Sequence, residues 1–121
     1  MQRTVMYCQT SHQIESVDIP KTDRASMAVL SPESEEDFLV RKVTLKNGGS
    51  MPYHTNTIQH QQYVLEGEAK VRIGEEIYHA KAGDFLYIPA GVAHAYEACY
   101  ESDYIFLCMI TTAEDVIEMV K

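Results

Sequence analysis

Short runs rich in valine, isoleucine, tyrosine and phenylalanine recur about every ten residues along this chain of 121 residues. Turn-forming residues separate them, as at 47–49, 67, 74–75, 82–84 and 89–91. This spacing is typical of an antiparallel sandwich or barrel. It predicts strands over residues 3–8, 26–30, 38–45, 53–56, 61–68, 69–74, 76–80, 84–89, 94–100 and 103–110.

Only the C-terminal end carries a helical signal. Thr111 stands three residues before Glu114, as in a capping box. The apolar residues that follow fall on one helical stripe, namely Ala113, Val116, Ile117 and Val120. The pattern predicts a short C-terminal helix that packs its apolar face on the sandwich.

The opening strand, over residues 1–9, has no obvious partner nearby in the sequence. An unpaired edge of a small sandwich is commonly covered by the same strand of a second subunit. We therefore expect a homodimer with this strand at its interface.

Length and charge restrict the class of protein. A chain of 121 residues is of ordinary size for one domain, so we expect a single domain over residues 1–121 with its barrel core at about 36–111. Ten basic residues, scattered rather than clustered, against eighteen acidic ones give a net charge of −8, which disfavours nucleic-acid and anionic-membrane partners. The longest apolar run, 104–110, is too short to span a bilayer, and the start lacks a basic region followed by an apolar one. The sequence predicts a soluble cytoplasmic protein.

The three cysteines are odd in number and include no CxxC pair; they are Cys8, Cys99 and Cys108. This disfavours both a disulfide framework and a cysteine zinc site. We expect reduced thiols.

Three of the five histidines, His54, His60 and His94, stand at predicted strand edges beside glycine turns. Residues two apart in a strand face the same side, so His54 and Asn56 can both point inward. If the hairpin closes on His60 and a later strand brings His94 alongside, three imidazoles converge at divalent-metal distances, about 2.0 to 2.1 Å for zinc. The spacing permits such a site without requiring it. The other two histidines, at 12 and 79, are interpreted as ordinary structural residues.

In these stretches the chain resembles the cupin superfamily, whose motifs read G-x5-H-x-H-x3-E-x6-G and G-x5-P-x-G-x2-H-x3-N. The matching positions are Gly48, His54, Asn56, His60 and Gly67, followed by Gly83, Pro89, Gly91, His94 and Ala98. Three residues depart from the motifs: Asn56 replaces the second histidine, His60 the glutamate and Ala98 the final asparagine. The resemblance implies an all-β jelly-roll sandwich, or double-stranded β-helix.

The chain is similar to small single-domain cupins with four histidine ligands, less one. This implies one divalent metal ion (Fe, Mn, Ni, Cu or Zn) held by His54, His60 and His94, with Asn56 as a weak or water-mediated ligand. Two or three coordination positions stay open for water, dioxygen or a chelating substrate. The resemblance therefore implies a mononuclear metal enzyme of oxygenase type acting on a small oxygen-chelating substrate.

Two other functions stay open. A sugar-acid isomerase or lyase needs a positioned acid or base, and the strand faces near the histidines offer no clear inward carboxylate. The absence of such a carboxylate favours the oxygenase slightly over the isomerase or lyase. A metal-dependent binding module without turnover is the third reading.

Strand parity selects the residues of the pocket wall. Arg41 shares a face with Leu39, Val43 and Leu45, which normally point into the barrel. An inward arginine is costly to bury unless it meets an anion. We therefore expect either an anionic ligand beside Arg41 or an arginine at the barrel mouth that reaches water or a neighbouring carboxylate. The remaining candidates are placed by parity, by nearness to His54 or, on the last strand, by the resemblance: Met51, Gln62, Tyr96, Phe106 and Cys108.

Overall fold

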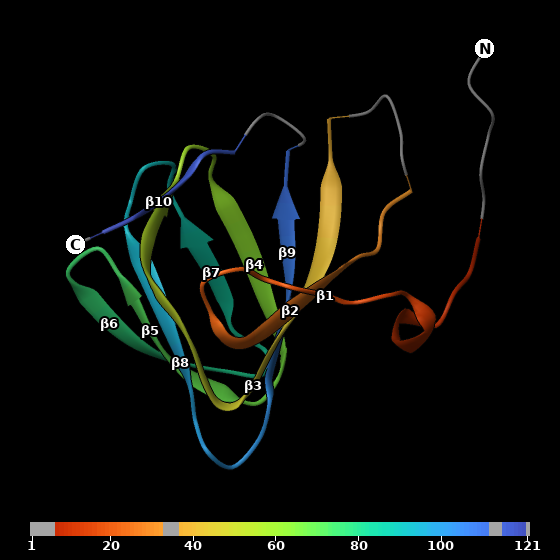
Figure 1. The fold of residues 1–121 in the computed structure, drawn as a ribbon, viewed down its shortest axis with the longest axis horizontal. Coiled ribbons are helices and arrows are strands. Elements are labelled where there is room, and N and C mark those ends of the chain that lie inside the picture. The colour runs from red at the N-terminus through yellow and green to blue at the C-terminus, as the bar shows by residue number, and fades with distance from the viewer. Residues whose placement is uncertain (1–6, 33–36, 112–114, 121) are drawn as a thin grey trace.

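The computed structural model describes residues 7–32, 37–111 and 115–120, and almost every element in them is a strand (Figure 1). A single turn of 3-10 helix, Ser11–Gln13, precedes the strands. The strands are β1 (Val17–Asp18), β2 (Asp23–Val29), β3 (Leu39–Asn56), β4 (His60–Glu66), β5 (Glu68–Ile73), β6 (Glu76–Lys81), β7 (Phe85–Ile88), β8 (His94–Ala98), β9 (Tyr104–Ile110) and β10 (Ile117–Met119).

The strands form one curled antiparallel sheet whose two halves face each other. Its order is β6-β5-β8-β3-β9-β4-β7, with β2 and β10 also paired to β3. The first part of β3 pairs with β9, and its last part pairs with β8. β3 therefore belongs to both halves and joins them. The predicted all-β jelly-roll fold is confirmed.

β3 turns this corner at Gly48 and Gly49, where the sequence predicted a turn between two strands. Gly48 has a φ of +70°, and a Cβ placed on it would lie 2.6 Å from the ring of Tyr100. A Cβ on Gly49 would lie 2.5 Å from the carbonyl oxygen of Asp23. The positive φ at Gly48 and the close approach of backbone at Gly49 both favour glycine. The predicted strands at 38–45 and 53–56 are thus parts of one strand of 18 residues.

The strand registers stack the inward side chains into layers. Leu45 lies opposite Tyr104, Val43 opposite Phe106 and Arg41 opposite Cys108. In the other half of the sheet, Met51 lies opposite Tyr96 and His54 opposite His94. We call the apolar end, at Leu45, Val64 and Tyr104, the closed end. We call the end at His54, His60 and His94 the histidine end.

The predicted C-terminal helix is wrong for the part of this segment that the structure describes. Residues 117–119 form β10, which pairs with β3 through Ile117 opposite Asn56 and Met119 opposite His54. The reason is that the end of β3 offers unpaired backbone groups, which a segment containing β-branched Val116, Ile117 and Val120 fills as a strand. Residues 112–114, with most of the proposed cap, lie outside the described residues.

The N-terminal strand predicted over residues 1–9 falls mostly on residues 1–6, which lie outside the described residues. Residues 7–10 have no regular secondary structure. The homodimer therefore stays a prediction. No helix among the described residues is long and apolar enough to cross a membrane.

Candidate metal centre

The histidine end is assembled from three strands. His54, near the end of β3, pairs in register with His94, the first residue of β8, and their ring centroids are 4.3 Å apart. His60, the first residue of β4, has its ring centroid 6.0 Å from that of His94. His60 and His94 are buried, and His54 is half-buried. The fold therefore gathers the three histidines that the motifs singled out.

Two of these imidazoles are oriented in the same way. Nδ1 of His54 lies 2.7 Å from the carbonyl oxygen of Pro52, and Nδ1 of His94 lies 3.0 Å from that of Val92. A carbonyl oxygen only accepts, so each Nδ1 carries the hydrogen and donates it. The lone pair of each ring is then on Nε2. Metal-binding histidines are commonly held by this kind of hydrogen bond on the other ring nitrogen.

Burial favours the neutral form of the His94 and His60 rings. It lowers the pKa of His94 to about 4, although the Val92 carbonyl works in the opposite direction. Burial also lowers the pKa of His60, and the positive charge of Arg41 adds to this effect while Asp115 opposes it. At neutral pH, both rings offer a lone pair rather than a second N–H.

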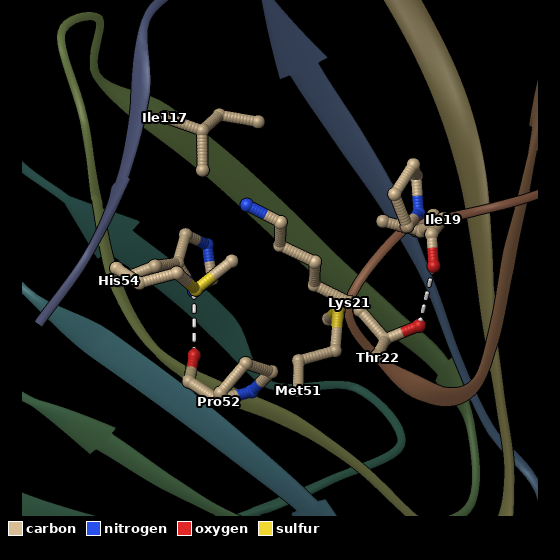
Figure 2. Close-up of a pocket in the computed structure, with 9 residues that line it drawn as sticks. Ile19, Lys21, Thr22, Met51, Pro52, His54 and Ile117 are labelled. Carbon is tan, nitrogen blue, oxygen red and sulfur yellow. Dashed lines mark hydrogen bonds between the residues drawn. The ribbon is translucent and has the colours of Figure 1, made fainter.

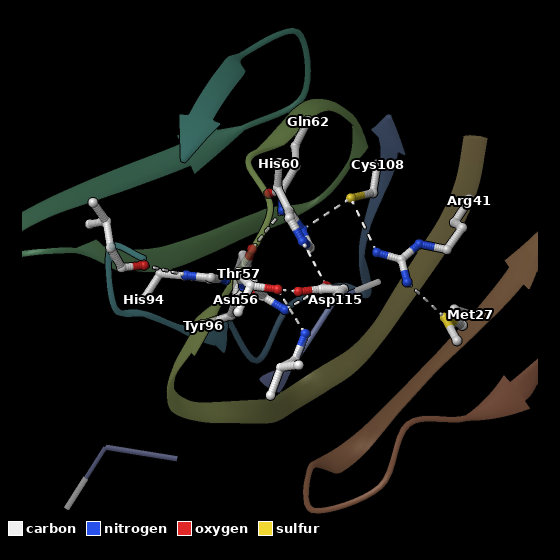
Figure 3. Close-up of polar contacts among 12 residues, drawn as sticks. Met27, Arg41, Asn56, Thr57, His60, Gln62, His94, Tyr96, Cys108 and Asp115 are labelled. Carbon is white, nitrogen blue, oxygen red and sulfur yellow. Dashed lines mark hydrogen bonds and ion pairs between the residues drawn. The ribbon is translucent and has the colours of Figure 1, made fainter. Parts of the chain in front are cut away.

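A carboxylate that the sequence did not suggest lies between these groups (Figure 3). Asp115 Oδ2 accepts a hydrogen bond of 2.9 Å from Asn56 Nδ2 and lies 3.4 Å from His60 Nε2. Its other oxygen accepts from the backbone N–H of Thr57 at 3.0 Å. The carboxylate enters because β10 pairs with β3 and thereby brings Asp115, two residues before β10, over the histidine end.

The contact with Asp115 fixes the orientation of the Asn56 amide. An ionised carboxylate only accepts hydrogen bonds, so the amide NH₂ must face it. Asn56 Oδ1 then points away, and this buried oxygen has no hydrogen-bond partner among the described residues. Among the described residues, the lone pairs of this oxygen are therefore not used in a hydrogen bond, and they could bind a metal ion.

A polar layer lies beneath the histidines. Cys108 Sγ is 3.4 Å from His60 Nδ1 and 3.6 Å from Nη2 of Arg41. Arg41 Nη1 is 3.6 Å from the sulfur of Met27, while its buried Nε has no partner within the described residues. Burial raises the pKa of the Cys108 thiol, although Arg41 favours its ionised form. The guanidinium therefore points into the barrel, and among the described residues its hydrogen-bond contacts there are with the sulfur atoms of Met27 and Cys108.

Gln62 and Tyr96 complete this layer and join the two halves of the sheet. Gln62 Nε2 donates a hydrogen bond of 2.7 Å to the Tyr96 hydroxyl, and both side chains are buried. Burial raises the pKa of Tyr96 far above its usual range, so its hydroxyl stays protonated.

Two adjoining hollows open onto the site. The inner one, of about 160 Å³, is lined by Arg41, His54, Asn56, His60 and Asp115, together with Met51, Tyr96 and Phe106. Gln62 and Cys108, which the sequence placed in the pocket wall, are not among its lining residues and lie in contact with Tyr96 and Arg41, which are. The outer hollow, of about 360 Å³, shares Met51, His54 and Ile117 with the inner one. In Figure 2 the ammonium group of Lys21 reaches into this outer hollow.

The donors are gathered but not closed on one point. Among the described residues, no three His, Cys, Asp or Glu side chains are arranged around a single metal-sized position. His60 Nε2 faces Asp115 instead. What the site offers is two free Nε2 lone pairs, a third imidazole, one amide oxygen without a partner and one carboxylate.

Sequence reasoning missed Asp115 and Lys21. Asp115 was placed inside the predicted helix, and the only signal for a strand was the alternation of Ile117, Glu118 and Met119, which is too short to decide. Lys21 lies between β1 and β2 in a left-handed conformation with a φ of 62°, which no pattern in the sequence indicates.

The sequence and the structure match known proteins. The family model of the cupin domain matches residues 41–110, more than half of the chain. The polyketide cyclase RemF from Streptomyces resistomycificus superposes with a TM-score of 0.87 at 19% identity, covering 97% of this chain and 87% of the cyclase. A cupin-2 domain protein from Rhodospirillum rubrum gives 0.85 at 16% identity, with coverages of 99% and 84%.

KdgF from a Halomonas species gives a TM-score of 0.75 at 17% identity, covering 91% of this chain and 96% of KdgF. No curated protein sequence matches the chain. At these identities the structural similarity shows the fold alone.

Proposed function

The chain belongs to the cupin-domain family, as its motifs predicted, and from this we propose that it binds one divalent metal ion at the histidine end and holds a small anionic ligand beside it. The observation that carries the proposal is the matched pair of hydrogen bonds from Nδ1 of His54 and His94 to backbone carbonyls. These bonds leave both Nε2 lone pairs free.

The donor set fits a divalent metal of the first transition row. Imidazole nitrogen suits Zn, Cu, Fe and Ni. The buried Oδ1 of Asn56, which has no hydrogen-bond partner among the described residues, could be satisfied by a cation. We assign His54, His60 and His94 as ligands and Asn56 Oδ1 as a weak fourth donor. Bound there, the metal would act as a Lewis acid that polarises the oxygens of a chelating ligand.

The charges around the hollows favour an anion. Arg41 reaches the inner hollow with a guanidinium that no carboxylate contacts among the described residues, and Lys21 extends into the outer one. A cation in an apolar wall is costly without a counter-charge. A ligand with an ionised oxygen would meet that need at Arg41 while its neighbouring oxygen faces the histidines.

Two classes of reaction suit such a ligand. An oxygenase would need open metal positions for a chelating enolate or diolate and dioxygen, which is the reaction that the sequence favoured. The structural similarity to the polyketide cyclase RemF, together with an inward carboxylate at Asp115, favours a second candidate, a ring-closing or isomerising reaction without dioxygen. Asp115 answers the objection that the histidine end lacks a carboxylate, provided that this carboxylate is not bound to the metal.

Elemental analysis of the protein, purified without added metal, tests the metal site. We expect about one equivalent of a divalent metal, lost when His54 and His94 are both replaced by alanine, because a single imidazole with oxygen donors holds such an ion weakly. His79→Ala is the matched control, since His79 is exposed and pairs with Glu68 on the outer surface. One equivalent retained in the double variant would contradict the assignment.

The anion site has an internal control in the next residue. Arg41→Met removes the inward charge, whereas Lys42→Met removes an outward one whose Nζ contacts Ser11. Binding of acetylacetonate to the cobalt-loaded protein, followed by visible absorption, should weaken at least tenfold in the first variant only. Equal affinities in the two variants would remove Arg41 from the ligand site.

Oxygen uptake separates the reaction classes. Protein loaded with iron or manganese is incubated with small diketones and diolates in an oxygen electrode. Uptake that requires both metal and substrate supports the oxygenase, and substrate conversion without uptake supports the cyclase or isomerase. Binding without conversion identifies a binding module.

A further inference from the structure

We propose that Asp115 is an anionic ligand of the metal centre, supplied by the C-terminal segment rather than by the motif strands. The inference rests on the proposed metal site and adds to it a residue that neither motif contains. It is carried by the position of the carboxylate, which three groups hold at the histidine end.

The carboxylate is held on two sides by donors that leave little freedom. Asn56 Nδ2 donates to Oδ2 at 2.9 Å, and the backbone N–H of Thr57 donates to Oδ1 at 3.0 Å. The next residue is fixed as well, because the Val116 N–H donates to the Thr57 hydroxyl at 2.9 Å. β10 then continues the pairing along β3. The position of Asp115 is therefore fixed by backbone hydrogen bonds on both sides of it, and not only by contacts of its own side chain.

The contact with His60 indicates what the carboxylate does. Oδ2 lies 3.4 Å from Nε2, the ring nitrogen that faces the site, while Nδ1 faces Cys108. A carboxylate oxygen and a nitrogen lone pair repel each other, so this approach is favourable only with a positive centre between them. Without metal that centre is a hydrogen on Nε2. The imidazole nitrogen of His60 and the carboxylate oxygen of Asp115 would together hold a divalent ion in place of this hydrogen.

Charge gives the same answer. The cupin motif has a glutamate at the position of His60, so three neutral imidazoles leave a bound cation with its full double charge. Asp115 restores one negative charge from a different part of the chain. Its side chain is 18% exposed, so water screens this charge only in part. The carboxylate of Asp115 would thus supply the negative charge that the motif glutamate supplies at position 60.

The test compares two variants on the same segment. Asp115→Asn keeps the shape of the side chain and removes its charge, and Glu118→Gln removes a charge from an exposed residue of β10. Dissociation constants for zinc are measured by competition with a chromophoric chelator, and cobalt-loaded protein is compared by its visible spectrum. We expect affinity to fall at least tenfold in Asp115→Asn, with an altered cobalt spectrum, and to stay within twofold in Glu118→Gln.

The outcomes separate the two proposals. If Asp115→Asn binds zinc as tightly as the unaltered protein, with the same cobalt spectrum, the carboxylate is not a ligand. If it binds more tightly, Asp115 is a competitor that holds His60 away from the metal, and the inference is likewise overturned. If the unaltered protein binds neither metal, the metal site itself is wrong, which is a different result from either of these.

Discussion

The two ends of the barrel share strands on which the inward residues stay buried from one end to the other, yet they differ in chemistry. Along β4 the inward residues His60, Gln62 and Val64 are 6%, 1% and 0% exposed. Along β8 the inward sequence is His94, Tyr96 and Ala98, at 1%, 3% and 2%. Within four residues, the inward side chain of each strand therefore changes from a histidine to a hydrocarbon side chain. Burial alone does not distinguish a binding site from a core.

The satisfaction of polar atoms distinguishes the two ends. Four buried side-chain atoms lack a hydrogen-bond partner among the described residues, and three of them lie toward the histidine end: Arg41 Nε, Asn56 Oδ1 and Gln62 Oε1. The fourth is the Tyr104 hydroxyl at the closed end. Orphaned polar atoms are costly, and they gather where a ligand can supply the missing partner. The closed end thus stabilises the fold, whereas the buried polar atoms at the histidine end lower the stability of the ligand-free protein.

The largest effect should come from a cavity at the closed end. Leu45 is fully buried against Tyr104 and its neighbours, so Leu45→Ala should lower the free energy of unfolding by about 3 to 4 kcal/mol. Chemical denaturation of the metal-free protein measures this loss. Metal stoichiometry at low temperature should be unchanged, because Leu45 is separated from the histidines by the polar layer. A variant that folds but binds no metal would show that the ends are coupled.

Acid should weaken the histidine end specifically. His94 has a folded-state pKa of about 4 against an ordinary value of 6.5, so the unfolded chain binds the proton more readily between these values. The metal-free protein therefore keeps this stability above pH 6.5 and loses it as the pH falls toward 4. The full difference is about 3 kcal/mol, from about 1.36 kcal/mol per pKa unit. His60, whose pKa is also lowered, acts in the same direction.

Denaturation of the metal-free protein at several pH values between 4 and 7 measures this dependence. The charged or titratable side chains that act on His94 are His54, His60 and Asp115. Of these, only the Asp115 carboxylate favours the protonated form of His94. His94→Asn should flatten the profile in this window, and His79→Asn, on the exposed surface, should leave it unaltered. Parallel profiles for the unaltered protein and His94→Asn would contradict the buried neutral state of His94.

Local pattern predicted most of the barrel but not its closure over the site. Alternation and glycine turns placed the core strands, and the motif spacing selected His54, His60 and His94. The register of β10 depends on a long-range pairing with β3, which adjacent residues do not encode. The sequence pattern therefore could not identify Asp115 as a site residue. On β9 both faces are apolar, so alternation left open which residues point inward; the structure buries Phe106 and Cys108.

The smallest effect should come from the polar layer that separates the two ends. Gln62→Leu removes the donor to Tyr96 and leaves a buried hydroxyl without a partner, which should lower the free energy of unfolding by about 1 to 2 kcal/mol. Gln62→Leu combined with Tyr96→Phe removes both groups, and with them the orphaned Gln62 Oε1. The double variant should return to within about 0.5 kcal/mol of the unaltered protein or exceed it. A double variant less stable than Gln62→Leu would mean that this layer holds the two halves of the sheet together. Recovered stability with weakened acetylacetonate binding would instead place the layer with the histidine end, as part of the ligand site.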